Sequence, residues 1–517
     1  MTVFRSQWAD IDPSDRTITE RLFDGLAGRA DSLAMFDGAT GRGLTGRAIM
    51  DGIKTLAGGL TERGYGAGAT VALMAPNCPE YCIALNGPLW AGGTVTTLNP
   101  TYTPAEARHQ LLDAGADLLI VTPDGLDTAQ AAIAGTRVRE IAVIGGAGGM
   151  LSLEALMGPA MEAQVPVDLD THIALLPYSS GTTGLPKGVM LSHRNVATNI
   201  AQSLPFLQIA PGDVTPAFLP FFHIYGMVCL LHGFLIAGGR IACMPRFDLE
   251  LFLSLIQTHK VPSLWIVPPV AIALAKHPIV DSYDLSSVNF VNCAAAPLAD
   301  EVGDALAARL GCAVSQGYGM TELSPVASAT RKDALCPGSV GQLIPNTECM
   351  IVDVASGTPR GVGEEGEIWI RGPQVMMGYL NRADATAETV DAQGWLHTGD
   401  VGLMDADGYL FIRDRVKELI KYKAFQVAPA ELEAALLGLS EIADAAVIGK
   451  PDEEAGEVPV AFVVPAQGVD IDPDAVMRAA TADLAHYKRL HGLTVVDAIP
   501  KSAAGKILRR VLRQQIG

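Results

Sequence analysis

The sequence predicts an α/β protein with a large multilayered N-terminal domain, in which helices flank β-sheets, and a small α+β C-terminal domain. Three observations lead to this prediction. The chain has 517 residues, several times the roughly 150 residues of a typical domain. Short apolar runs alternate with helical segments along most of its length, and a strongly charged segment then sets off the final part of the chain.

The apolar runs that suit buried strands are rich in β-branched residues and occur at residues 71–74, 118–121, 141–144 and 173–176. Residues 45–60 instead carry apolar side chains at helical spacing, at Ile49, Ile53, Leu56 and Leu60. This alternation of strands and helices predicts layered βαβ units.

The domain boundary is expected where the apolar residues 409–412 give way to the charged run 413–423. The residues beyond that run read as helix, strand, strand, helix, strand. We therefore expect an N-terminal domain of residues 1–413 and a C-terminal domain of residues 414–517.

Composition narrows the class of function. With 49% hydrophobic and 18% charged residues, the chain is globular rather than disordered. A net charge of -19 provides no basic surface for nucleic acid and disfavours anionic lipid. The N-terminus lacks a signal-peptide pattern, the longest apolar stretch is too short for a bilayer, and the eight cysteines are sparse, as in reduced core cysteines. We expect a cytoplasmic protein with small-molecule partners and no stable membrane association.

The strongest local motif is the loop at residues 178–188, which follows a predicted strand. Its glycines can turn backbone amides inward, and its hydroxyls and one lysine add donors, as in a phosphate cradle. It is not a Walker A loop, because Pro186 and Gly188 flank the lysine. Two GxGxxG matches, at residues 41–46 and 361–366, are interpreted as turns. The phosphate-binding residues would be Ser179, Ser180, Gly181, Thr182, Thr183, Gly184 and Lys187.

Four further motifs follow the loop, at residues 316–322, 366–372, 394–400 and 421–426. Together with it they resemble the adenylate-forming superfamily, most closely 4-coumarate:CoA ligases and related fatty-acyl-CoA synthetases, from about residue 20 to Arg510. The resemblance implies that a carboxylate attacks the α-phosphorus of ATP, that pyrophosphate leaves, and that coenzyme A then takes the acyl group. It implies ATP, Mg²⁺ and coenzyme A as cofactors.

The resemblance also assigns roles to residues. It implies that Lys506, on a mobile small domain, bridges the carboxylate and the α-phosphate, that Glu322 beside Thr321 carries Mg²⁺, and that His223 lines the acyl channel. Lys417 would be the hinge of the small domain. The adenine slot would be formed by Ala295, Ala296, Gln316, Gly317 and Tyr318, and Asp400, with Arg415 nearby, would accept the ribose hydroxyls. Thr321, Lys421 and Gln426 would also contact the nucleotide, and Lys423 and Ala424 would lie along the coenzyme A path.

The acyl pocket implied by the resemblance contains His223, Tyr225, Ala294, Gly319, Pro325 and Val326. The plant ligases have glycine where this chain has Ala294 and Ala424. Since Ala294 narrows the pocket floor, cinnamate or 4-coumarate is favoured over acids with bulkier rings. His193, just after the phosphate loop, is interpreted as a structural capping residue.

Several other interpretations stay open at this stage. Outside the resemblance, Glu322 and Lys506 would be surface residues and His223 a core histidine. A medium- or long-chain fatty acyl-CoA synthetase is the main alternative function. A non-catalytic nucleotide-binding homologue and a luciferase-like oxygenase are more distant ones. An amino-acid-activating domain is disfavoured, because residues 221–226 lack an acidic anchor for an ammonium group.

Overall fold

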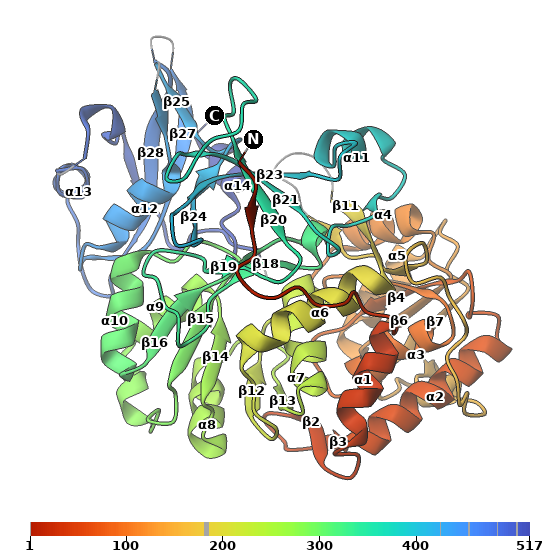
Figure 1. Cartoon of the computed structure of the whole chain (residues 1–517). Coiled ribbons are helices and arrows are strands. Elements are labelled where there is room, and N and C mark those ends of the chain that lie inside the picture. The colour runs from red at the N-terminus through yellow and green to blue at the C-terminus, as the bar shows by residue number, and fades with distance from the viewer. Residues whose placement is uncertain are drawn as a thin grey trace.

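The computed structural model describes residues 2–179, 186–423, 425–452, 455–482, 484–502 and 505–516. A large N-terminal body holds most of the sheets, and a smaller C-terminal unit packs against one side of it (Figure 1). The predicted α/β class with a large and a small domain is therefore confirmed.

The largest sheet has nine strands in the order β10-β11-β9-β5-β4-β6-β7-β8, with β22 also paired to β11. The four runs predicted as strands are β4, β6, β7 and β9, each within one residue of the prediction. The bounds are β4 Thr70–Met74, β5 Thr94–Thr97, β6 Leu118–Val121, β7 Glu140–Val143, β8 Leu151–Ser152, β9 Ile173–Leu175, β10 Tyr178–Ser179, β11 Lys187–Ser192 and β22 Gly378–Tyr379.

Helix α2 (Gly46–Glu62) leads into β4, and α3 (Tyr81–Trp90), α4 (Pro104–Ala114) and α5 (Leu126–Ala132) connect strands of this sheet. Helix α2 fulfils the helical prediction for residues 45–60. Its N-cap is Thr45, whose side chain accepts a hydrogen bond from the Ala48 N–H. Residues 41–46, predicted as a turn, span the end of the β2–β3 turn, strand β3 and the first residue of α2.

The second part of the body contains two smaller sheets. In the four-stranded sheet β12-β13-β2-β3 only β3 is antiparallel, and the three-stranded sheet β14-β15-β16 is parallel. Helix α6 lies between these two sheets and the first sheet (Figure 1). The strands are β2 Leu33–Asp37, β3 Gly43–Thr45, β12 Val214–Ala217, β13 Arg240–Cys243, β14 Ser263–Ile266, β15 Phe290–Cys293 and β16 Ala313–Gln316. The helices are α1 Ile18–Ala27, α6 His193–Leu207, α7 Gly233–Ile236, α8 Leu249–His259, α9 Pro268–Lys276 and α10 Asp300–Leu310, with a π-helix at Tyr225–His232.

Two antiparallel sheets complete the body, β17-β18-β19 and β1-β20-β21-β23-β24. Strand β24 leads directly into the small domain. The bounds are β1 Phe4–Arg5, β17 Tyr318–Gly319, β18 Val326–Ala329, β19 Gln342–Leu343, β20 Glu348–Val352, β21 Gly366–Arg371, β23 Leu396–Met404 and β24 Leu410–Arg415, with helix α11 at Ala383–Thr389.

The small domain is a five-stranded sheet, β26-β25-β28-β27 with β29 beside β28, covered by helices. The helix, strand, strand, helix, strand order is present as α12, β27, β28, α13 and β29, while the β25–β26 hairpin and the last helix were not predicted. The bounds are β25 Ile420–Tyr422, β26 Phe425–Val427, α12 Pro429–Leu437, β27 Ile442–Asp452, β28 Gly456–Pro465, α13 Pro473–Ala480, β29 Leu493–Val495 and α14 Arg509–Arg513.

Apolar side chains from both halves of the body form one continuous core, which includes fully buried Phe221, Phe234 and Phe252. The small domain has its own core between the sheet and α12. All eight cysteines lie in described residues and are free, five of them buried. Within the described ranges, no helix is long and apolar enough to cross a membrane.

Candidate active site

The adenine-binding residues predicted from sequence lie at the carboxyl ends of β15 and β16. These parallel strands end together, so that the Gly317 N–H donates to the Cys293 carbonyl at 3.3 Å. The Gln316 side chain accepts from the Leu298 N–H at 2.8 Å and thereby holds the loop that contains Ala295 and Ala296. Ligands of parallel α/β sheets bind at such an edge. The exposed Ala295 has a φ of 74°, a conformation that favours glycine.

Asp400, the predicted ribose ligand, is buried at 5% exposure between two polar partners. The Tyr318 hydroxyl donates to its Oδ2 at 2.6 Å, and Arg415 Nε lies 2.9 Å from its Oδ1. Arg415 pairs with Asp400 in register across β23 and β24. Burial, followed by the Asp400 charge, raises the pKa of Tyr318 far above its usual value. Each carboxylate oxygen keeps a lone pair, so the group can still accept from ribose hydroxyls.

At the phosphate end, Ser179 and Lys187 face each other across the β10–β11 hairpin. Ser180, Gly181, Thr182, Thr183 and Gly184 lie outside the described residues. The Lys187 ammonium lies 4.0 Å from the centre of the Tyr379 ring. This cation–π contact holds the lysine at the end of the loop.

Glu322 is 3% exposed, beside Thr321 at 9%, so it is not a surface residue. Its Oε1 accepts from the Tyr379 hydroxyl at 2.8 Å, while no described residue donates to Oε2. No cluster of three or more metal-ligating His, Cys, Asp or Glu side chains occurs among the residues that the structure describes. A single hard carboxylate with one open oxygen fits a cation that shares its remaining ligands with phosphate and water, as Mg²⁺ does.

Tyr379 thus joins Lys187 to Glu322, and the sequence did not reveal it because it lies beyond the motif at residues 366–372. The only sequence signal for Tyr379 was an aromatic residue directly after a glycine, Gly378. Strand β22 places it, because Tyr379 pairs with Val189 of β11, two residues after Lys187.

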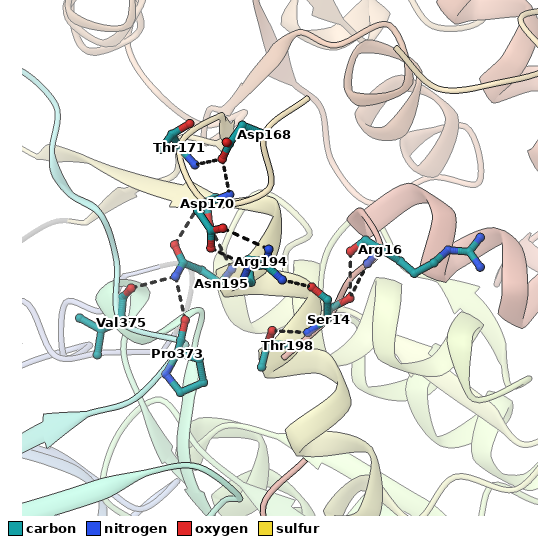
Figure 2. A network of polar contacts seen from close by, with 11 residues as sticks. Ser14, Arg16, Asp168, Asp170, Thr171, Arg194, Asn195, Thr198, Pro373 and Val375 are labelled. Atoms are coloured by element: carbon teal, nitrogen blue, oxygen red, sulfur yellow. Dashed lines mark hydrogen bonds and ion pairs between the residues drawn. The ribbon is translucent and has the colours of Figure 1, made fainter. Parts of the chain in front are cut away.

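The first turn of α6 holds residues 373–375 through its side chains (Figure 2). The Asn195 side chain donates to the carbonyls of Pro373 and Val375 at 2.8 and 3.0 Å. The next residue along, Met376, donates its N–H to the Glu322 carbonyl at 2.9 Å. Arg194 anchors the same turn to Asp170 and to the Ser14 carbonyl.

His193 has the capping role expected of it, but it caps the start of α1 rather than its own helix, α6. Ser192 is the N-cap of α6, with Asn195 completing a capping box. The His193 Nδ1 accepts the Ile18 N–H at 3.3 Å, at the start of α1. Burial lowers the pKa of His193 to about 3.

The predicted acyl-pocket residues lie in two places. His223 and Tyr225 flank the start of the π-helix, and the buried Tyr225 hydroxyl has no hydrogen-bond partner among the described residues. Cys293, next to Ala294, is one of the electrostatic neighbours of Tyr225. Burial, followed by the charge of Lys506, lowers the pKa of His223 to about 4, so the ring is neutral at pH 7.

The other place is the β17–β18 ladder, where Gly319 pairs with Val326. A Cβ at Gly319 would lie 2.2 Å from the Pro325 carbonyl oxygen, so a side chain is excluded there. Asn199 of α6 holds this ladder, since it accepts from the Val326 N–H at 3.0 Å and donates to its carbonyl at 2.9 Å.

Lys506 comes from the small domain and lies within electrostatic reach of Asp400, Arg415 and His223. Burial, followed by the neighbouring Arg415, lowers its pKa to about 8. A partly dehydrated ammonium therefore lies near Asp400 and His223. These groups are far apart in sequence, and docking of the small domain brings them together.

The remaining predicted residues lie elsewhere in this arrangement. Lys417 is exposed in the turn after β24, and Lys421 and Lys423 are exposed on the β25–β26 hairpin. The hairpin lies at the top of the view, on the side of the small domain away from α9 and α10 (Figure 1). Ala424 is outside the described residues, as is the side chain of Gln426, whose backbone pairs with Lys421.

Residues 22–380 match the family of AMP-binding enzymes, and residues 431–506 match the AMP-binding enzyme C-terminal domain. The chain belongs to the AMP-binding enzymes. Among their curated members, it is 42% identical to 4-coumarate--CoA ligase 5 of Oryza sativa subsp. japonica, over 99% of this chain and 97% of that protein. It is also 42% identical to 4-coumarate--CoA ligase 2 of Petroselinum crispum, with the same coverage.

Solved structures of AMP-binding enzymes share the whole fold. An anthranilate CoA ligase in complex with anthranoyl-AMP superimposes with a TM-score of 0.91 at 26% identity, over 98% of this chain and 99% of that one. ATP-bound MatB from Rhodopseudomonas palustris gives 0.88 at 29% identity, over 96% and 98%. This AMP-binding enzyme is an acid–thiol ligase, which joins a carboxylic acid to coenzyme A at the expense of ATP.

Proposed function

We propose that this AMP-binding enzyme activates a phenylpropanoid-type aryl acid, 4-coumarate or cinnamate, as its acyl-adenylate and passes the acyl group to coenzyme A. The identity of about 40% over the full length of plant 4-coumarate--CoA ligases supports this substrate class. A medium- or long-chain fatty acid is the alternative substrate.

The observation that carries the choice of an aryl acid is the buried Tyr225 hydroxyl without a partner. An unsatisfied buried hydroxyl costs about 1–3 kcal/mol. A phenolic hydroxyl that reached it, such as that of 4-coumarate, would supply the missing hydrogen bond. An alkyl chain or the unsubstituted ring of cinnamate would leave it unsatisfied, so the observation favours 4-coumarate. His223, two residues before Tyr225, is neutral at pH 7 and places no charge in this region.

In the proposed reaction, Lys506 contacts the substrate carboxylate and the α-phosphate and stabilises the charge that develops between them. Lys187 and Ser179 bind the outer phosphates, together with Ser180, Gly181, Thr182, Thr183 and Gly184. Asp400, with Arg415 and Tyr318, orients the ribose, and the Gln316 and Gly317 edge with Ala295 receives the adenine. Mg²⁺ would be held by Glu322, beside Thr321, and would neutralise charge on the departing pyrophosphate.

We propose that residues 414–517 form a mobile domain that pivots near Lys417. In a second placement, Lys423 and Ala424 would line the coenzyme A path, and Lys421 and Gln426 would approach the nucleotide. Movement of a small domain about a short hinge is a common way to complete an active site. The eight free cysteines support a reducing, cytoplasmic location.

The substrate is tested by coenzyme A-dependent AMP release with purified enzyme and ATP-Mg²⁺, across cinnamate, 4-coumarate, caffeate, octanoate and palmitate. We expect turnover to be greatest with cinnamate or 4-coumarate. Greater turnover with octanoate or palmitate would replace the aryl-acid proposal with a fatty acyl-CoA synthetase.

The role of Lys506 is tested by Lys506→Met in the two half-reactions. Pyrophosphate release from acid and ATP should fall by a factor of about 10² to 10³, the usual effect of losing a contact of this kind. Thioester formation from supplied acyl-adenylate should persist. Equal loss in both half-reactions would reject the assignment.

A further inference from the structure

Helix α9 contacts the small domain at both of its ends. At its start, Val267 and Pro269 enclose Gly505, where a Cβ would lie 3.2 to 3.4 Å from their side-chain atoms. Gly505 has a φ of 80° and precedes Lys506 directly. The N-terminal end of α9 therefore packs against the residue that precedes Lys506.

At the other end of α9, Lys276 reaches into the small domain. Its ammonium donates to the Ile442 carbonyl at 3.1 Å and lies 3.5 Å from the Leu437 carbonyl. Leu437 is the last residue of α12, where helix carbonyls lack intrahelical partners and the helix dipole favours a cation. Burial lowers the pKa of Lys276, as expected for an ammonium in a domain contact.

Among the described residues, these are the only hydrogen bonds that join residues 1–398 to residues 417–516. The other contacts between the two parts are apolar or electrostatic, such as Gly438 packing near Glu301 of α10. Figure 1 shows α12 above α9 and α10, with the rest of the small domain extending away from the body. Apart from the β23–β24 connection, where the Val416 N–H donates to the Gly399 carbonyl, Lys276 thus supplies the hydrogen bonds that hold α12 against the body.

We propose that Lys276 is a positioning residue for the adenylation step, because it caps the C-terminus of α12 and holds the small domain where Lys506 faces the site. The proposal rests on the function proposed for Lys506. A charged group that donates to carbonyls contributes at least about a factor of ten to an equilibrium constant. Its loss shifts the small domain away from the docked placement and lowers the population in which Lys506 is in position.

The test compares Lys276→Met, which keeps the length of the side chain but removes its donors, with Lys276→Arg, which keeps a cation. Lys260→Met is the matched control, since Lys260 lies at the C-terminal end of a body helix, α8, as Lys276 does of α9, but its ammonium bonds to Asp284 of the body. Both half-reactions are measured for each variant with 4-coumarate, together with Tm and hydrogen exchange of peptides that cover residues 434–445.

We expect Lys276→Met to slow pyrophosphate release by about threefold to tenfold, to leave thioester formation from supplied adenylate unchanged, and to speed exchange at residues 434–445. Lys276→Arg should restore most of the rate, and Lys260→Met should resemble the wild type. Unchanged adenylation, or an equal fall in both half-reactions, would overturn the proposal. If Lys506→Met retains adenylation in the same assay, the function proposed for Lys506 fails instead, whatever Lys276→Met does.

Discussion

The Tyr379 hydroxyl donates to Glu322 at 2.8 Å, and the ring of the same tyrosine carries the ammonium of Lys187 at 4.0 Å. The Tyr379 side chain thus fixes the separation between Lys187 and Glu322. Lys187 and Glu322 make no ion pair with each other in the described structure. Their spacing leaves both available to a nucleotide.

Tyr379→Phe should raise the KM for ATP-Mg²⁺ and lower kcat/KM about tenfold or more, because Glu322 loses a hydrogen bond to a charged group. The phenyl ring retains its contact with Lys187, so Tyr379→Leu should be worse than Tyr379→Phe. Initial rates of pyrophosphate release at varied ATP check this order. Full activity in Tyr379→Phe would show that the hydroxyl does not position Glu322.

The pH dependence of adenylation should reflect Lys506, whose pKa in the free enzyme is lowered to about 8. The protonated form is the one that can stabilise negative charge, so kcat/KM should fall as pH rises through about 8. Lys506→Arg, which stays protonated, should be slower at pH 7 but should lack this alkaline decline. A decline that persists in Lys506→Arg would assign the titration to another group.

Tyr225→Phe separates hydroxylated from unsubstituted aryl acids. If the Tyr225 hydroxyl meets a phenolic hydroxyl, its removal should reduce kcat/KM for 4-coumarate by about tenfold and affect cinnamate much less. Parallel measurements on the two acids provide the control within each variant. Equal effects on both acids would place the Tyr225 hydroxyl away from the ring substituent.

Stability should decline in mild acid because two fully buried histidines, His193 and His232, have pKa values lowered to about 3 and about 4. In the unfolded chain these histidines become protonated below about pH 6.5. In the folded chain they stay neutral until the pH approaches their lowered pKa values. The free energy of unfolding therefore decreases as the pH falls below about 6.5, by about 1.4 kcal/mol per pH unit for each histidine.

Urea unfolding at pH 5.0 and 7.5 measures this loss. His193→Gln should lower stability at pH 7.5, since the Ile18 N–H loses a good acceptor, but should show a smaller difference between the two pH values. An unchanged pH difference in His193→Gln would contradict the role assigned to His193.

Local pattern was enough to predict much of the fold. Residues 118–121 form β6 as predicted, and Thr45 caps the helix whose apolar spacing was read from Ile49 to Leu60. These features depend on neighbours a few residues apart, which a sequence displays directly. The β25–β26 hairpin was missed because its strands are only three residues long and lie in a charged run.

The candidate site was predicted less completely. The motifs supplied the types of group needed, with Asp400, Glu322, Lys187 and Lys506 among them, but no spacing in the sequence linked Glu322 to Tyr379, 57 residues away. The buried environment that lowers the pKa of Lys506 also arises only when the small domain meets the body.

The sequence by itself determined the family, the α/β class and the chemical groups of the site, because periodicity, turn residues and motif spacing are local properties. The tertiary structure alone decided which of those groups meet. Tyr379 between Lys187 and Glu322, and Lys276 beneath α12, are contacts between segments distant in the chain. Such contacts form because burying apolar faces brings the segments together, and the favourable burial depends on the whole packed fold rather than on any one segment.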